Sequence, residues 1–506
     1  MLKNSFYIII ITIALTFSVE LVMYGIYLVT GSKYVSNLSE DRSRALHYEG
    51  KVLDCHIDSK KDVKKPIRIA IFGGSSSVGF ASPVSFTDLL CDSGFNNNHD
   101  MEITNYAGHG EPLAGFQAEI IKSVMNYYDV IIIYSGHNEK NNQIYLRESR
   151  TVFPNGIPFK QPRSVHKTRV QKLNKIKYRL NPKHSISYPM IVENSRVHYF
   201  LARIIDKLTR YMGVKLKPSK KETIYPKDFY YSDYFISPAE RKSIINLYKK
   251  NIIEISNKLR KDQKLILSTV LSNDLFPPLA DVYPVSHGNE IDVLNDQLIQ
   301  TYFFLSNNEY EKVRESVSML PKSAHRYYLE GILCLRTDLG SANPMPKDCI
   351  SKLKKARDLD GLPSRVPSEI NSFIRQFRHD NVVVVDPVTS MLNKVSNSDD
   401  YREYFVDFQH PSNLGHALIA ENILFGLFGS DVTSRSYDIS ACGINWKHKS
   451  KLKSFNVSLK KCVTYLKINM KWLDTFMKIQ PIPYQYDYYK SAAERALMML
   501  EKKTIS

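Results

Sequence analysis

The chain of 506 residues has little cysteine and no cysteine pattern typical of a metal site. Its six cysteines include no CxxC pair and no Cys/His cluster at zinc spacing, so the sequence argues against a disulfide scaffold and a structural zinc module. Glycine and proline occur in ordinary numbers, 21 and 23, which excludes collagen-like and linker-dominated chains. With 43% hydrophobic and 24% charged residues, the chain has the composition of a folded protein larger than one average domain.

Long hydrophobic runs are also scarce, since a single stretch at residues 6–30 is long and apolar enough to cross a bilayer. It contains one charge, Glu20, and no convincing small-residue cleavage site follows it. The sequence therefore predicts an uncleaved single-pass membrane anchor, with a long buried core helix as the alternative. Basic residues flank the stretch on both sides and orient it only weakly. An amino-terminal anchor is common in envelope enzymes, so we expect an extracytoplasmic body.

The positive charge is concentrated in one segment. The formal net charge is +18, and residues 160–221 hold 17 Lys and Arg against two acids. Such a block favours anionic lipid headgroups or an anionic polymer as a neighbour, while a solvated insertion is the alternative. No nucleic-acid motif accompanies the block. We therefore expect a membrane surface or an acidic glycan, and no nucleic acid, as the partner.

Four apolar runs have the character of buried parallel strands, at residues 67–72, 129–134, 264–270 and 381–386. Helical patterns separate them, and this alternation predicts an α/β fold with a three-layer, doubly wound parallel sheet and helical insertions. Ligands of such sheets bind at the carboxyl ends of the strands. The residues that follow each run are therefore the candidate site residues.

Ser75 follows the first run in the sequence GGSSSVG. A serine at a strand-to-helix turn exposes its hydroxyl beside the helix amides, which suits a nucleophile. The alternative is a phosphate-binding loop, because Gly74 and Gly79 have its spacing. Phe80 and Ala81 stand where that loop requires Lys and Ser or Thr. The sequence thus favours a serine nucleophile over a phosphate-binding loop, although a Gly/Ser turn taken alone is more often structural.

Four further residues at strand ends and loops have catalytic potential. Gly108 lies in a turn after a short run, and Asn138 follows the second apolar run; a backbone N–H and a side-chain amide both donate to an oxyanion. Asp407 and His410 are three residues apart in DFQHP, so the carboxylate can hold the imidazole as a base. Each of these residues, taken alone, is more often structural.

Together, the blocks FGGSSS, NYAGHG, SGHNE and DFQHP, in this order, resemble the SGNH/GDSL hydrolase superfamily. The resemblance covers roughly residues 66–144, 261–285 and 380–428. It implies a nucleophile at Ser75, a base at His410 oriented by Asp407, and oxyanion donors from Gly108, Asn138 and the Ser75 backbone. It implies no metal and no cofactor.

The sequence departs from the family at two positions, where Gly74 replaces the usual Asp before the serine and Glu139 replaces the usual Asp after the asparagine. Neither change removes a catalytic group. Two more residues are candidates for substrate contact. Asn273 follows the third run, and Arg365, which precedes the last strand, can reach an anionic substrate group; a surface arginine is the alternative.

The predicted organisation interleaves a core with insertions. The segments are an anchor (1–31), three parts of the core (32–144, 261–289 and 378–430), a basic, largely helical insertion (145–260), a helical insertion (290–377) and a helical extension (431–506). In the second insertion Tyr327, Leu329 and Gly331, followed by a turn and another helix, resemble a tetratricopeptide helix pair. A single pair must pack on the core or on a protein partner; a plain helical insertion is the alternative.

The resemblance implies an anchored serine ester hydrolase or O-acyltransferase that works through an acyl-serine intermediate. The anchor and the basic segment favour an acyl or acetyl ester of an envelope glycan or lipid as substrate. The rival hypothesis is a catalytically silent SGNH-fold protein that binds or assembles envelope polysaccharide. The two differ in whether Ser75 is activated. A nucleic-acid binder would instead show steep salt dependence mapped to residues 160–221.

Overall fold

A computed structural model describes the chain at residues 51–55, 66–80, 82–96, 101–141, 236–279, 288–337, 345–429, 437–438, 453–454, 459–477, 489–491 and 493–498. All of them belong to one compact unit, formed by residues 50–162 and 227–506. The predicted membrane span and the basic segment at 160–221 lie outside the described residues. Within the described ranges, no helix has the length and apolar character needed to span a bilayer.

A six-stranded sheet forms the centre of this unit, with strand order β1-β3-β2-β4-β5-β6. Five neighbouring strands are parallel, and β1 pairs antiparallel with β3 at one edge. The predicted α/β fold with a parallel sheet is therefore confirmed. The strands are β1 (Lys51–Cys55), β2 (Ile67–Gly73), β3 (Met101–Asn105), β4 (Val130–Tyr134), β5 (Lys264–Ser268) and β6 (Val382–Val385).

The chain order across this sheet creates a switch point between β2 and β4. From β2 the chain moves outward to β3, and it then returns to the other side of β2 to form β4. Adjacent crossovers diverge at such a point, and the crevice at the carboxyl ends of the strands is the usual ligand site of the fold. The segments after β2 and β4, which carry Ser75 and Asn138, therefore both lie at this switch point.

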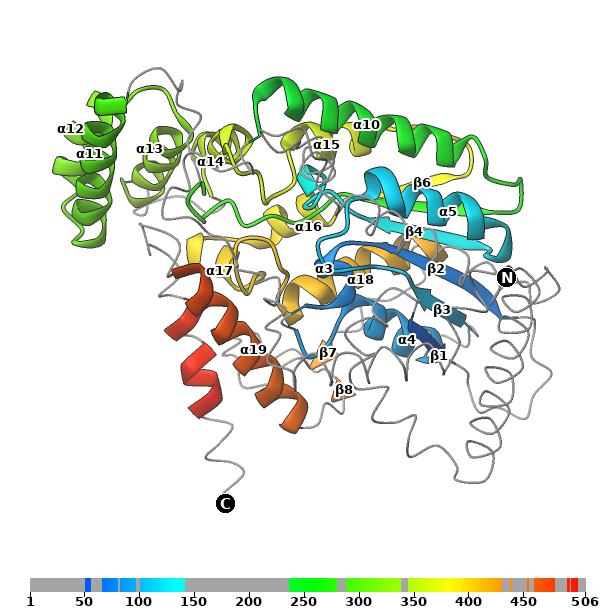
Figure 1. Ribbon diagram of the computed structural model, residues 1–506. Helices are drawn as coiled ribbons and strands as arrows, with labels where there is room; N and C mark the ends of the chain where they lie inside the picture. Colours follow the sequence, from blue (N-terminus) through cyan, green and yellow to red (C-terminus); the bar gives the residue numbers. More distant parts are fainter. Residues whose placement is uncertain are drawn as a thin grey trace, which may run out of the picture. The chain divides into compact units, whose positions relative to one another are not determined.

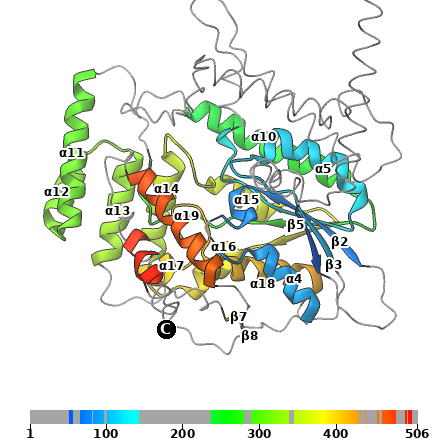
Figure 2. The ribbon, with the colours of Figure 1, turned by 60° about the horizontal axis from the view of Figure 1, so that its bottom comes forward.

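Helices cover both faces of the sheet, as Figures 1 and 2 show. One face carries α4 (Phe86–Asn96) and α18 (Asn413–Phe428); the other carries α5 (Ala118–Val124), α10 (Pro238–Ser256) and α15 (Ser368–Gln376). All five residues of β4 are buried. A strand covered on both faces can have the uninterrupted apolar sequence VIIIY, because both of its sides meet helices.

Helix α10 is a crossover helix of the core, although the sequence places residues 145–260 together in the basic insertion. A capping box begins it: Ser237 accepts from the Glu240 amide, and Glu240 accepts from the Ser237 amide. Pro238 occupies the first helical position, where its missing N–H costs nothing. Its buried face packs toward α5 and α15.

The second insertion is helical and packs on the core, but the end of the predicted range 290–377 differs from expectation, since α15 covers the core sheet. Its helices are α11 (Gly288–Ser306), α12 (Tyr310–Met319), α13 (Ala324–Thr337) and α14 (Lys347–Leu359). A Cβ at Gly331 of α13 would lie 2.7 Å from a Leu353 side-chain carbon on α14, so glycine permits this close approach. Tyr328 Oη donates to the Leu275 carbonyl, 2.7 Å away, and connects α13 with the loop after β5.

Disulfides are present, contrary to what the sparse cysteine suggested. Cys334 on α13 and Cys349 on α14 are bonded, and Cys91 and Cys462 are disulfide-bonded as well. The described part of the chain holds no free cysteine. Facing helices bring together cysteines that have no motif spacing, so the sequence pattern did not reveal them. The disulfide between α13 and α14 braces the helical insertion.

The remaining elements are short, except for the carboxyl-terminal helix α19. They are α3 (Ser75–Val78), the π-helix η1 (Leu113–Gln117), the 3-10 helix η2 (Met125–Tyr127), α16 (Pro387–Lys394), α17 (Ser398–Arg402), β7 (Tyr437–Asp438), β8 (Lys453–Ser454) and α19 (Leu459–Met477). The helix expected in the carboxyl-terminal extension is confirmed by α19. A small apolar cluster there contains Cys462, Leu466, Ala493 and Ala496.

Candidate active site

Ser75 begins helix α3 directly after β2. The helix is one turn long and ends at Gly79, whose left-handed conformation (φ 82°) suits glycine. Ser75 therefore occupies the first helical position, where the backbone N–H has no acceptor within the helix. The Ser75 side chain is close to the switch point but only 7% of the residue is exposed.

Three of the predicted residues meet in a continuous hydrogen-bonded relay. Ser75 Oγ lies 2.7 Å from His410 Nε2, and His410 Nδ1 lies 2.6 Å from Asp407 Oδ2. The ionised carboxylate accepts only, so Nδ1 carries the proton and Nε2 is left to accept from the serine hydroxyl. This is the geometry in which histidine serves as the base for a serine nucleophile.

The loop that carries His410 also holds Asp407 in its ionised form. The amides of Gln409 and His410 donate to Asp407 Oδ1 at 2.8 and 2.7 Å. Burial of Asp407 opposes ionisation, but His410 and these hydrogen bonds outweigh it and lower the pKa of the carboxyl below its usual value. Asp407 therefore remains an anion that orients the imidazole.

Phe80 forms an aromatic wall beside the base. Its ring centroid lies 4.6 Å from that of His410 and 5.4 Å from that of His109. From the sequence alone, Phe80 served only to argue against a phosphate-binding loop. The packing gives it a positive role, because the ring restricts the rotation of His410 and shields the relay from water.

Asn138 lies against the backbone that precedes the nucleophile. A Cβ at Gly74 would lie 2.2 Å from Asn138 Nδ2 and 3.7 Å from the Glu111 carbonyl oxygen. Any side chain at position 74 would therefore displace the Asn138 amide. This contact accounts for the glycine at position 74, and it places the Asn138 amide beside the backbone that precedes Ser75.

Gly108 does not fit the role predicted for it. Its backbone N–H donates to the Gly73 carbonyl at 3.1 Å, so the pairing of the β3 segment with β2 continues past Asn105 and occupies this donor. The chain then turns at Gly110 (φ 70°). Asn141 Nδ2 donates to the Gly110 carbonyl at 2.6 Å and ties this turn to the loop of Asn138.

Glu139 braces the same loop. It is buried and accepts from the amides of Leu113 and Ala114, at 2.9 and 3.1 Å, and from Ser135 Oγ at 3.0 Å. Burial raises the pKa of its carboxyl in spite of these donors. Glu139 thus connects the loop after β4 with the start of η1, and its role is to position the adjacent Asn138.

Asn273 is a positioning residue and not the substrate contact that we predicted. It is fully buried, and its Nδ2 donates to the Asp407 carbonyl at 2.9 Å and to Tyr489 Oη at 2.6 Å. Its backbone N–H donates to the Phe408 carbonyl. These bonds fix the backbone of the loop that carries the catalytic acid, which leaves the side chain unable to reach a substrate.

Arg365 is also buried, so neither substrate contact nor the surface alternative applies. Only 3% of the residue is exposed. Its guanidinium donates to the carbonyls of Asn273, Phe276 and Pro277 and pairs with Asp360 Oδ2 at 3.4 Å. Arg365 therefore fixes the backbone of the loop after β5.

Tyr489 is a contributor that the sequence did not reveal. It comes from the carboxyl-terminal extension, its Oη accepts from Asn273 Nδ2, and its ring stacks on Phe276 with centroids 5.2 Å apart. No motif surrounds it, since its role depends on where the chain returns to the core.

Within the described ranges, no group of three or more His, Cys, Asp and Glu side chains is arranged to hold a metal ion. The arrangement instead provides a nucleophile, a base and an orienting acid. A scan against models of known protein families and a search of curated protein sequences both find no match to this chain.

Proposed function

We propose that the protein is a membrane-anchored serine hydrolase or acyltransferase of the SGNH/GDSL type. The observation that carries the proposal is the relay in which Ser75 Oγ lies 2.7 Å from His410 Nε2 and His410 Nδ1 lies 2.6 Å from Asp407. A nucleophile, a base within reach of its proton and an acid that orients the base are what acyl transfer through a covalent intermediate requires.

In the proposed reaction, Ser75 Oγ attacks the carbonyl carbon of an ester while His410 Nε2 takes the hydroxyl proton. The Ser75 N–H and Asn138 Nδ2 donate to the oxyanion that forms. Collapse of this intermediate expels the alcohol, which receives the proton from His410 and leaves an acyl group on Ser75. Water or a sugar hydroxyl then attacks, again through His410, and restores the serine.

The proposed substrate is an acyl or acetyl ester of a cell-envelope glycan or lipid. Two features of the sequence support this class: the apolar stretch at residues 6–30 and the basic segment at 160–221. An anchor keeps the body near a membrane, and Lys and Arg attract anionic polymers and headgroups.

The disulfides support an extracytoplasmic location for the body. Cys91, Cys334, Cys349 and Cys462 are all disulfide-bonded, and such bonds persist in oxidising compartments but are rare in the cytosol. The proposed single-pass orientation therefore leaves the catalytic body on the outer side of the membrane.

Labelling with a fluorophosphonate probe tests the proposal, using the full chain solubilised in detergent. We expect wild-type protein to be labelled, and Ser75→Ala and His410→Ala to lose labelling because they remove the nucleophile and its base. Ser76→Ala is the matched control, since Ser76 is the adjacent buried serine and hydrogen-bonds only weakly, at 3.4 Å, to the Gln409 carbonyl.

Absence of labelling in folded wild-type protein, checked by circular dichroism, would contradict the proposal. It would favour the binding or assembly function, which does not require an activated serine. Labelling that persists in Ser75→Ala would assign the reactive group to another residue and would equally contradict the mechanism.

A further inference from the structure

A polar cavity adjoins the loop after β5, among helices α14, α15, α16 and α17. Its volume is about 120 Å³, and its charged walls are Asp274, Lys354, Arg357 and Arg375. Ser272 and Asp274 line it, whereas Asn273 between them bonds to the Asp407 carbonyl. Neighbouring residues of one loop therefore contact both the cavity and Asp407.

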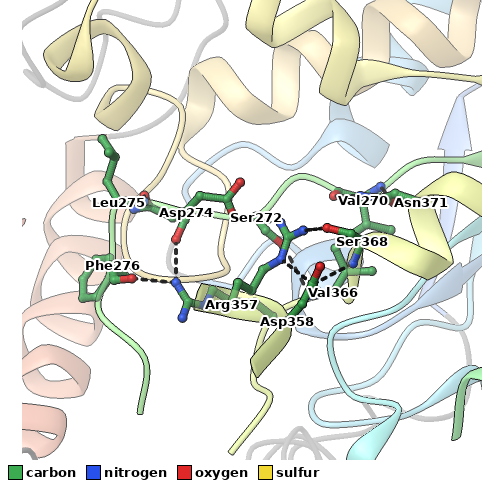
Figure 3. A network of polar contacts seen from close by, with 12 residues as sticks. Val270, Ser272, Asp274, Leu275, Phe276, Arg357, Asp358, Val366, Ser368 and Asn371 are labelled. Atoms are coloured by element: carbon green, nitrogen blue, oxygen red, sulfur yellow. Dashed lines mark hydrogen bonds and ion pairs between the residues drawn. The ribbon is translucent and has the colours of Figure 1, made fainter. Parts of the chain in front are cut away.

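Arg357 lines this cavity, and Figure 3 shows its polar contacts with Asp274, Asp358 and Ser368. Only 5% of the residue is exposed. It donates from Nη1 to Asp274 at 2.6 Å and from Nη2 to Ser368 Oγ at 2.5 Å, and its Nε lies 3.4 Å from Asp358. These hydrogen bonds connect Arg357 with other residues of the cavity lining and fix the position of Asp274.

The second arginine of the wall is paired from outside the cavity. Arg375 Nε and Nη2 contact the Asp386 carboxylate at 2.7 and 3.3 Å. Asp386 also accepts from Thr269 and Thr389, which anchor it at the start of α16. Of the three cations that line the cavity, both arginines therefore have carboxylate partners, Asp274 and Asp358 for Arg357 and Asp386 for Arg375.

Lys354 is the cation whose charge is not matched. It lines the cavity and is partly buried, and among the described residues it forms no ion pair. Burial lowers the pKa of its ammonium; Asp274 opposes this effect, while Arg357 and Arg375 lower the pKa further. An anion that enters the cavity supplies the partner that the Lys354 ammonium lacks, and it compensates for the loss of water around that group.

We infer that this cavity binds a small free oxyanion, such as phosphate, sulfate or a short carboxylate, with Lys354 as its main charged ligand. Size limits the occupant, because a cavity of about 150 Å³ accommodates benzene and this one is smaller. A whole lipid or sugar phosphate is therefore too large to be enclosed, and a free ion is the occupant that the volume fits.

Occupancy of the cavity stabilises the loop at residues 272–275. An anion bound to Lys354 adds contacts to the wall that Arg357 and Asp274 form, and Asp274 is the chain neighbour of Asn273, which bonds to the Asp407 carbonyl. The ligand therefore reduces local opening of the segment that supports Asp407.

Calorimetric titration with inorganic phosphate, sulfate and acetate tests this inference on the full chain in detergent. Sodium chloride at matched ionic strength is the reference. We expect saturable binding to one site per chain, and affinity weakened about tenfold or more in Lys354→Met, the loss of one charge-assisted hydrogen bond. Lys347→Met is the matched control, because Lys347 is exposed on the same helix and should leave affinity unchanged.

Hydrogen exchange of residues 270–276 gives a second readout that needs no catalysis. We expect phosphate to slow exchange in wild type and in Ser75→Ala, but not in Lys354→Met. Binding in Ser75→Ala separates the cavity from the proposed catalytic function. Absence of saturable binding, equal weakening by both lysine variants, unchanged exchange on binding, or tighter binding of glycerol phosphate than of inorganic phosphate would each overturn the inference.

Discussion

Asp407 shows how much of the candidate catalysis depends on one buried side chain. One carboxylate oxygen faces His410 Nδ1 at 2.6 Å, and the other accepts two backbone amides of its own loop. The carboxylate therefore determines both the tautomer and the direction of the imidazole. An amide in its place keeps the shape but can present N–H to Nδ1 and reverse the tautomer.

Asp407→Asn should lower the rate of Ser75 acylation by about four orders of magnitude, the cost of a misoriented histidine in a serine triad. The measurement is the second-order rate of fluorophosphonate labelling, with circular dichroism to verify the fold. Asp399→Asn is the control, since the Asp399 side chain is 74% exposed. A labelling rate within tenfold of wild type would show that Asp407 does not orient the base.

The contact between Gly74 and Asn138 is the second feature decided by single residues. The 2.2 Å gap between a Cβ at position 74 and Asn138 Nδ2 means that Gly74→Ala must move the amide. We expect Gly74→Ala and Asn138→Ala each to reduce the acylation rate by about 10²–10³, the cost of one oxyanion donor.

A double-mutant cycle separates this explanation from general damage to the turn. If Gly74→Ala acts through Asn138, the double variant should be no slower than Asn138→Ala alone. Multiplicative losses in the double variant would mean that the methyl group harms the site by another route.

At the scale of elements, the loop after β5 supports the catalytic loop through buried polar contacts. The Arg365 guanidinium donates to the carbonyls of Asn273, Phe276 and Pro277. Asn273 Nδ2 in turn donates to the Asp407 carbonyl. Polar side chains that satisfy buried carbonyls hold a loop in one conformation, because each lost donor leaves an acceptor unpaired.

Arg365→Met should lower the free energy of unfolding by about 3–5 kcal/mol, because it leaves Asp360 and several buried carbonyls without their donor. Denaturant unfolding followed by circular dichroism is the measurement. The exposed Arg378, which donates only to nearby carbonyls, provides the control variant Arg378→Met. Unchanged stability with a raised KM for an ester substrate would instead restore Arg365 as a substrate contact.

At the scale of the whole molecule, buried histidines couple stability to pH. His416 is fully buried in α18, and its Nδ1 accepts from the Phe86 amide at 3.3 Å. Burial lowers its pKa to about 3; Asp88 opposes this shift and His410 adds to it. In the unfolded chain the group titrates near its ordinary value of about 6.5.

The unfolded chain therefore binds one more proton than the folded protein between those two pKa values, and unfolding becomes easier as the pH falls below about 6.5. His416→Gln removes this term. Between pH 6.5 and 4.5 its unfolding free energy should decrease by about 2–3 kcal/mol less than that of wild type. Denaturant unfolding across this range measures this difference. If the two proteins differ in unfolding free energy by the same amount at pH 6.5 and at pH 4.5, the coupling is disproved.

The local sequence was sufficient to predict most of the sheet and the catalytic relay. Runs such as VIIIY are apolar throughout because both faces of the strand are covered, and residues that follow such strands converge on one edge. The pairing of Ser75 with His410, 335 residues away, was expected from the order of the four sequence blocks and their resemblance to a known superfamily. Asn138 was predicted on the same basis.

Tertiary structure alone decided what the remaining polar residues do. Gly108 N–H is occupied by the Gly73 carbonyl, and Asn273 and Arg365 are buried supports. Spacing along the chain does not reveal burial or hydrogen-bond partners, because these depend on which segments pack together. The disulfide between α13 and α14 and the contact of Tyr489 with Asn273 likewise arise from segments that only the folded chain brings together.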